Sequence, residues 1–203
     1  MNGQINEQGL DVGVIPVPGF GYINASQWIE DGIYDTVTIA SGAVTAGTEY
    51  EFFSSLANKG KDDTNMAEAN KLPEGWEIII IKMGLEILPS ANLLDIQAFA
   101  ERSHLRFETG NTKIRRRAPT YCWPICFGMN AMHVLDTQAS TLRKGILQIG
   151  GVGFGGAPNL LLPVRISPRL NFKTVLNITD AQTFNADFRI RFWLYGYVSR
   201  PVQ

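Results

Sequence analysis

The residue types that most often perform catalysis are scarce in this chain of 203 residues. It contains two histidines, His104 and His133, and neither stands in a recognisable catalytic motif; a G-x-S-x-G nucleophile elbow is also missing. Two histidines are too few for the clustered imidazoles of a metal-binding barrel. A Ser-His-Asp triad built from distant segments stays open, although a surface or hydrogen-bonded role is the simpler interpretation of His104.

A glycine-rich segment, Gly151–Gly156, matches the G-x-G-x-x-G pattern of dinucleotide-binding loops. That chemistry needs a helix directly after the glycines, because the N–H groups of its first turn hold the pyrophosphate. Here Pro158 and Pro163 follow instead, and the next acidic residue, Asp180, is distant. The segment therefore predicts a flexible loop and no cofactor.

The two cysteines and a pair of aspartates also give little indication of a redox or metal site. Cys122 and Cys126 are separated by three residues, which fits neither a C-x-x-C redox pair nor half of a four-ligand zinc site. They are interpreted as inert thiols of a protein made in a reducing cytoplasm. Asp62 and Asp63 could hold a cation at a subunit seam, but two solvated loop carboxylates are the simpler interpretation. The sequence thus predicts no catalytic residue, no metal ligand and no small-molecule substrate, and we expect that the chain is not an enzyme.

Four basic residues lie close together, at Lys113, Arg115, Arg116 and Arg117. Because side chains alternate along a strand, we expect Lys113, Arg115 and Arg117 to share one face. Such a patch suits the phosphates of a genome, the anionic headgroups of an internal membrane, or acidic residues of a neighbouring subunit. A solvated strand end is the alternative.

The last strand has the clearest pattern in the sequence. Residues predicted to face the core are Phe188, Ile190, Phe192, Leu194 and Val198. They alternate with a second set, Arg189, Arg191, Trp193, Tyr195 and Tyr197. Arginine and aromatic residues are enriched where proteins meet, so the second set predicts a subunit-contact face.

Alternation with a period of two recurs along the chain and places these residues on strands. Strands are expected within 33–40, 48–56, 104–108, 113–117, 121–127, 146–149, 163–166 and 170–178. Trp76–Ile81 predicts a central strand covered on both sides, and Ser90–Arg102 a short helix. Strands and helices do not alternate as they do in parallel-sheet proteins. We therefore expect an all-β fold, a single eight-stranded antiparallel jelly roll over 31–203, preceded by an extended N-terminal arm over 1–30; two jelly rolls would strain this length.

The composition excludes several classes of protein. Hydrophobic residues make up 45% of the chain and charged residues 18%, with a formal net charge of −1. A disordered chain would have a lower hydrophobic fraction and a larger net charge, and a strongly basic nucleic-acid binder would have a large positive net charge. Met1–Leu10 lacks the features of a signal peptide, and Trp76–Leu88 is too short and too charged to cross a bilayer. A chain poor in charge and rich in aromatic residues is expected to cover part of its surface with copies of itself.

Four short motifs follow one another between residues 50 and 203. They are Phe52–Leu56 with a Gly-Lys loop and Asp63–Met66 behind it, the hairpin segment Leu105–Pro119, the strand segment Ile166–Leu176, and the C-terminal Leu194–Gln203. In this order they resemble the capsid proteins of small tailless icosahedral bacteriophages. The segment 120–160 has no counterpart in this resemblance.

The resemblance implies a structural virion protein with a jelly-roll fold, the major capsid protein, which self-assembles into an icosahedral shell around the genome. Its partners would be copies of itself in capsomers such as trimers, together with other virion proteins. It would be synthesised in the host cytoplasm and reside in the virion. No functional residues are carried over from the family.

Two other functions stay open at this level. A carbohydrate-binding jelly-roll recognition module would use Trp193, Tyr195 and Tyr197 as a stacking platform. A β-sandwich hydrolase would depend on His104 and His133.

Overall fold

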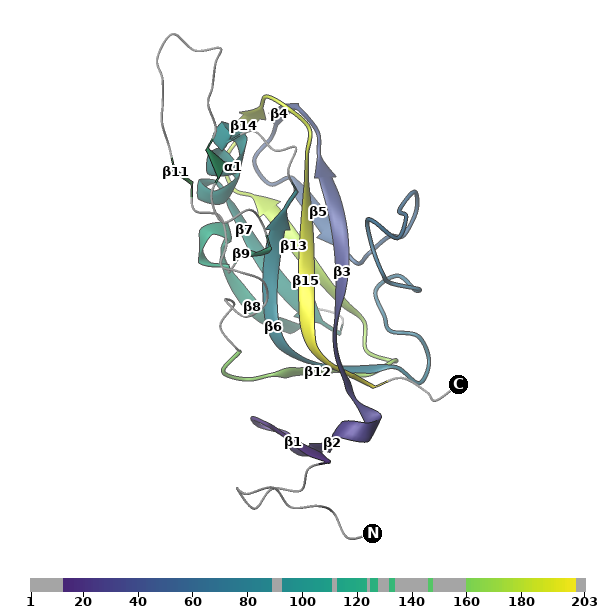
Figure 1. Cartoon of the computed structure of the whole chain (residues 1–203). Coiled ribbons are helices and arrows are strands. Elements are labelled where there is room, and N and C mark those ends of the chain that lie inside the picture. The colour runs from purple at the N-terminus through teal and green to yellow at the C-terminus, as the bar shows by residue number, and fades with distance from the viewer. Residues whose placement is uncertain are drawn as a thin grey trace.

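Two β-sheets pack face to face and enclose the hydrophobic core (Figure 1). The computed structural model describes residues 13–88, 93–110, 113–123 and 160–199, and the backbone of 125–127, 132–133 and 146–147. The first sheet has the order β12 (Val164–Ile166), β6 (Glu77–Ile87), β15 (Phe188–Ser199) and β3 (Ile29–Ile39). The second has the order β5 (Glu49–Phe52), β13 (Phe172–Ile178), β7 (Ser103–Thr109) and β8 (Lys113–Pro119).

Strand pairing is antiparallel throughout these two rows of four strands. One further strand, β9 (Ile125–Phe127), pairs with β6 in parallel. The predicted all-β, antiparallel architecture is therefore confirmed, with β9 as an exception.

Short elements lie outside the two main rows. They are the hairpin strands β1 (Val14–Val17) and β2 (Gly21–Asn24), the pair β4 (Gly42–Val44) and β14 (Gln182–Phe184), the pair β10 (Met132–His133) and β11 (Ile146–Leu147), the helix α1 (Leu93–Glu101), and the 3₁₀ turns η1 (Ala25–Gln27) and η2 (Thr120–Cys122). In Figure 1 the purple hairpin β1–β2 lies below the ends of the main sheets. The pair β4–β14 was not expected from the sequence, because runs of three residues give no recognisable period.

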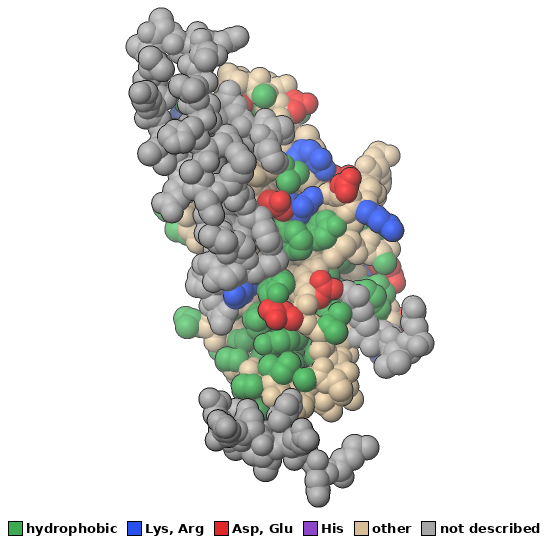
Figure 2. Space-filling view, in the orientation of Figure 1, with side chains coloured by type: hydrophobic (Ala, Val, Ile, Leu, Met, Phe, Trp, Pro, Cys, Tyr) green, Lys and Arg blue, Asp and Glu red, His purple; other side chains and the backbone are tan. Residues whose placement is uncertain are grey.

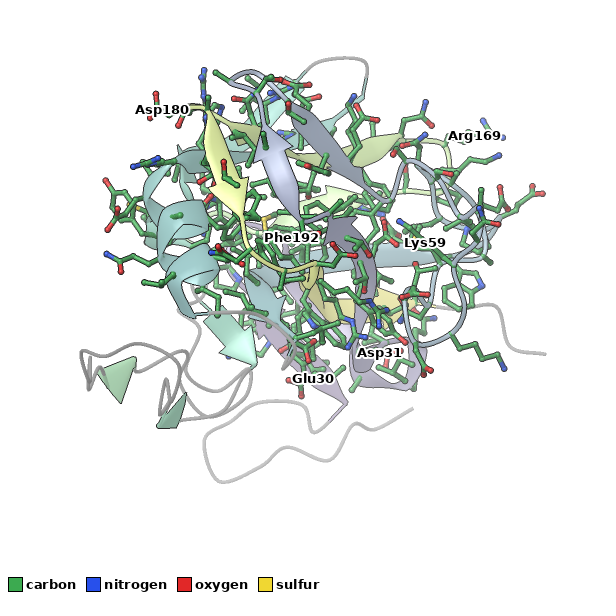
Figure 3. The ribbon with its side chains drawn as sticks, turned by 90° about the horizontal axis from the view of Figure 1, so that it is seen from above. Glu30, Asp31, Lys59, Arg169, Asp180 and Phe192 are labelled. Atoms are coloured by element: carbon green, nitrogen blue, oxygen red, sulfur yellow. The ribbon has the colours of Figure 1, made fainter. Side chains whose placement is uncertain are left out.

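The core forms where the alternating faces of the two sheets meet. Along β15 every second residue is buried, as its sequence pattern predicts. Phe192 lies in the middle of the molecule when it is seen from above (Figure 3). Its ring lies 5.7 Å from that of Phe52 and 5.4 Å from that of Trp123, between centroids. Tilted and edge-on aromatic pairs of this kind stabilise a core beyond the area they bury.

The strand β6 is central, as Trp76–Ile81 predicts. It lies between β12 and β15, and Ile78, Ile79 and Ile80 are all buried although they alternate between the two faces of the sheet. Gly196 on β15 is packed against it so closely that a Cβ there would lie 1.9 Å from the carbonyl oxygen of Ile79. The pairing of β15 with β6 shifts its register at this point.

Two of the predicted strands are shorter than expected. The strand predicted over 48–56 ends at Phe52, because Phe53 has a left-handed φ of 68° that breaks the extended chain. The strand predicted over 121–127 is interrupted, since η2 occupies its start and only β9 is extended.

The predicted helix is confirmed as α1, although Ser90, its expected N-cap, lies outside the described residues. Asp95 in its first turn is almost fully buried and accepts hydrogen bonds of 3.0 Å from the backbone N–H groups of Asn185 and Ala186. This carboxylate ties α1 to the connection between β14 and β15.

Candidate functional site

The outer face of β15 carries the residues predicted to contact another subunit. Arg189, Arg191, Trp193, Tyr195 and Tyr197 alternate with buried residues and are all half-buried themselves. They therefore share the face of the first sheet that points away from the core. Figure 2 views this face, and hydrophobic side chains gather over its lower part beside acidic ones.

Arg191 is the centre of a compact cluster on the upper part of this face. Its guanidinium carbon lies 4.8 Å from the ring centroid of Tyr34 and 5.8 Å from that of Trp193. It donates to Glu86 Oε2 at 3.0 Å, and the Nε1–H of Trp193 donates to the same oxygen at 2.9 Å. Cation–π contacts and a shared carboxylate hold these side chains in one geometry.

The loop between β5 and β6 covers one side of this cluster. Arg189 forms an ion pair with Asp63, and Arg191 donates to the carbonyl oxygen of Asp62. The carboxylate of Asp63 also accepts the backbone N–H of Gly60 at 3.1 Å. The structure thus gives Asp63 an intrachain cationic partner, an arrangement that neither sequence interpretation of the two aspartates included. The described residues hold no group of three or more His, Cys, Asp or Glu side chains arranged around a common metal position.

Tyr195 lies on the lower part of the same face. Its hydroxyl donates to Glu30 Oε1 at 2.8 Å. Burial, together with this hydrogen bond to a carboxylate, raises the pKa of Tyr195 to about 12. The tyrosine therefore stays a neutral hydrogen-bond donor far above neutral pH.

The structure confirms the basic strand β8, but the expectation that Lys113, Arg115 and Arg117 share one face of it is wrong. The pairing with β7 shifts between Phe107 and Glu108, so that a β-bulge falls at Arg115. Lys113 pairs with the buried Thr109, whereas Arg117 pairs with Arg106 on the opposite, outward side. The extra residue at the bulge thus prevents Lys113, Arg115 and Arg117 from sharing one face.

The bulge also directs Arg115 and Arg116 toward the edge of the core. Arg115 Nε donates to Thr109 Oγ1 at 2.7 Å. The guanidinium carbon of Arg116 lies 4.5 Å from the ring centroid of Trp123, and burial lowers the pKa of Arg116. This cation–π contact could not be predicted from the sequence, because it depends on where η2 places Trp123.

His104 lies on the outward face of β7, with Arg106 and Arg117 nearby. Burial first, and then the two arginines, lower the pKa of His104, and Glu49 opposes this shift. An imidazole surrounded by positive charge favours its neutral form. Of the other sequence candidates, the Gly151–Gly156 loop lies outside the described residues, and only the backbone is described for His133 and Cys126.

A buried ion pair beneath the β5–β6 loop was missed by the sequence interpretation. Asp35 on β3 is fully buried, and its Oδ2 accepts from Lys59 Nζ at 2.6 Å and from the backbone N–H of Phe53 at 2.5 Å. The signal was present, because Asp35 stands among Ile33, Val37 and Ile39 on the apolar face of its strand. A carboxylate in that position requires a partner, and Lys59 supplies it.

Comparison of the chain with protein-family models, with curated proteins and with solved structures finds no match in any of the three. Among the described residues, no helix has the length and apolar character to span a membrane. The function must therefore be argued from topology and from the surfaces described above.

Proposed function

We propose that this protein is a jelly-roll subunit of a virion shell, the major capsid protein, which self-assembles around a genome. On this proposal it acts as a structural protein without catalytic activity, is made in the host cytoplasm and resides in the virion. The observation that carries the proposal is the order of the strands in the two main sheets.

Numbered along the chain, the eight strands of the two rows are β3, β5, β6, β7, β8, β12, β13 and β15. In these terms the first sheet has the order sixth, third, eighth, first, and the second sheet has the order second, seventh, fourth, fifth. Successive strands thus lie in opposite sheets, except the fourth and fifth, which pair as a hairpin in the second sheet, and this order supports two interlocked Greek keys. This order supports our proposal of a jelly roll, an eight-stranded architecture found in viral capsid domains, lectins and cupins.

The motifs that resemble phage capsid proteins support the capsid among these classes. The segment Leu105–Pro119 forms the hairpin of β7 and β8, and Ile166–Leu176 joins β12 to β13. Each of these two motifs therefore lies on consecutive strands of the proposed jelly roll. A cupin would bind its metal through clustered histidines, and the chain has only two.

The carbohydrate-binding alternative receives less support from the geometry. A stacking platform needs an aromatic ring with an accessible face. The ring of Trp193 lies 4.5 Å from that of Tyr34, and Arg191 approaches both rings. Its Nε1–H donates to Glu86. These contacts commit the ring to its own chain.

The proposal is tested by the assembly state of the purified full chain. We expect capsomers or closed particles in light scattering after size-exclusion chromatography and in negative-stain electron microscopy. Tyr197→Asp, on the outer face of β15, should reduce the assembled fraction at least tenfold, whereas Thr183→Asp, at an exposed position of β14, should leave it unchanged. A monomer at millimolar concentration, or specific binding in a glycan array, would overturn the proposal.

A role of Lys113, Arg115 and Arg117 toward genome phosphates or lipid headgroups stays a prediction. Reversing these charges should then reduce the genome content of particles in a salt-sensitive way. Particles with normal genome content would contradict that role.

A further inference from the structure

The N-terminal hairpin exposes large apolar side chains next to acidic groups. In the described part of the chain, β1 pairs only with β2. Phe20 is 38% exposed, Tyr22 66%, and Ile29 at the start of β3 49%. Glu30 and Asp31 follow, lying near each other beside the N-terminal strands (Figure 3). From Val14 to this point the chain has no lysine or arginine, so the segment is apolar and its two charged residues are acidic.

A hollow of about 180 Å³ has the complementary character. It lies where β6, β12 and β8 approach one another, and it is lined by Met83, Leu160, Leu161, Leu162, Val164, Arg115 and Arg116. Leu161 is 95% exposed and Leu162 78%. Over its full length β8 carries four basic residues and no acidic one. The hollow thus combines an apolar wall with a positive rim.

We propose that the hairpin of one copy docks into this hollow of a second copy. Phe20 and Tyr22 enter among the exposed leucines, where an aromatic anchor in an apolar pocket contributes most to binding. The rings lie within reach of the guanidinium of Arg115, which adds a cation–π contact. The inference rests on the proposed self-assembly and names the contact that produces it.

Charge complementarity selects a second copy as the occupant. Glu30 and Asp31 stand behind the aromatic side chains and meet the basic residues of β8, which orients the two chains as they approach. The hairpin and the hollow are different surfaces of the chain. A contact between them is therefore head-to-tail, and repetition of the same contact closes a ring of subunits when the rotation allows it.

A disulfide between two different variants tests this contact. In a Cys122→Ser, Cys126→Ser background, Tyr22→Cys and Leu161→Cys chains with tags of different mass are co-expressed and mildly oxidised. We expect a crosslinked heterodimer on a non-reducing gel. Tyr121→Cys in place of Tyr22→Cys is the matched control, because Tyr121 is 68% exposed but belongs to η2 and not to the hairpin, and it should not crosslink to Leu161→Cys of another chain.

A second variant keeps the inference testable without oxidation. Tyr22→Ser should raise the protein concentration needed for assembly at least tenfold, whereas Tyr121→Ser should not change it. Assembled particles without the crosslink, and with unchanged Tyr22→Ser assembly, would overturn the contact and leave the capsid proposal standing.

The remaining outcomes separate the two claims. Crosslinked open chains that form neither capsomers nor closed particles would support the contact and overturn the capsid proposal. A crosslink found only within one chain, when Tyr22→Cys and Leu161→Cys are combined in a single molecule, would show that the hairpin folds back on its own hollow and would overturn the contact between copies. A monomer without any crosslink would overturn both.

Discussion

The outer faces of the two sheets carry different kinds of side chains. The second sheet presents a ladder of ion pairs in which Arg106 donates to Glu49 at 2.8 and 3.2 Å and to Glu108 at 2.5 Å. The first sheet presents arginine and aromatic rings, with Arg191 and Trp193 sharing Glu86. The first pattern is typical of a face turned to solvent, and the second is typical of a protein contact.

The ladder of the second sheet also covers apolar surface. Val175 on β13 has Glu51 and Arg106 as its register partners, and it is fully buried although it points outward. Lys173 reaches Glu51 at 2.5 Å on the same face. The alkyl parts of these long side chains cover the valine while their charged ends stay near water. The apolar side chain of Val175 is therefore covered by its own chain.

The largest effect is expected where the first sheet is most tightly built, at Gly196. Gly196→Ala would place a Cβ 1.9 Å from the carbonyl oxygen of Ile79, which only a shift of β15 against β6 can relieve. We expect a loss of more than about 3 kcal/mol in the free energy of unfolding, measured by urea denaturation. Gly60→Ala, where a Cβ meets nothing within 4 Å, is the control and should change stability by less than about 0.5 kcal/mol. Equal effects of the two substitutions would contradict the close packing.

The next effect concerns the ion pair that anchors the β5–β6 loop against the first sheet. Lys59→Met leaves the buried carboxylate of Asp35 with the N–H of Phe53 as its described donor, and we expect a loss of about 3 kcal/mol. Combining Lys59→Met with Asp35→Asn should recover at least half of this loss, because the amide carries no charge. A double variant less stable than Lys59→Met would show that the charge is not the cause.

These two cases show what the sequence could and could not predict. The alternation along β15 was readable because a long regular strand repeats its pattern many times. The ion pair of Asp35 was missed because its partner, Lys59, comes from a loop that follows the left-handed Phe53, and no pattern in the sequence places this loop against β3. The face of Arg115 was missed for a related reason, since a single bulge reverses the alternation and leaves no mark in composition.

A direct comparison of the two faces comes from Arg191→Gln and Arg106→Gln. Arg191 and Glu86 are 16% and 19% exposed and lie among aromatic rings, so we expect a loss of about 2 kcal/mol that changes little in 1 M NaCl. Arg106 is 20% exposed and pairs with Glu49, which is 39% exposed, and with Glu108, which is 13% exposed, so we expect about 1 kcal/mol, reduced further by salt through the exposed Glu49. If salt screened both losses equally, the distinction between a contact face and a solvent face would fail.

The smallest effects are in the pH dependence of stability, and they fall on opposite sides of neutrality. The pKa of His104 is lowered in the folded protein, so the unfolded chain takes up the proton first and stability falls as pH drops below about 6.5. The pKa of Tyr195 is raised to about 12, so its contribution is lost as pH rises from about 10 to about 12. His104→Gln should flatten the acid side and Tyr195→Phe the alkaline side of a curve of melting temperature against pH. If His104→Gln flattened the alkaline side, or Tyr195→Phe the acid side, the assignment of these pH effects to the two residues would be contradicted.

Sedimentation velocity of the full chain over a range of concentrations tests the central claim most directly. If the chain is a capsid subunit, we expect a discrete, rapidly sedimenting species of fixed size. Its share of the protein should increase, and that of the 22.5 kDa monomer decrease, as the concentration rises. A single 22.5 kDa species at every concentration would contradict self-assembly.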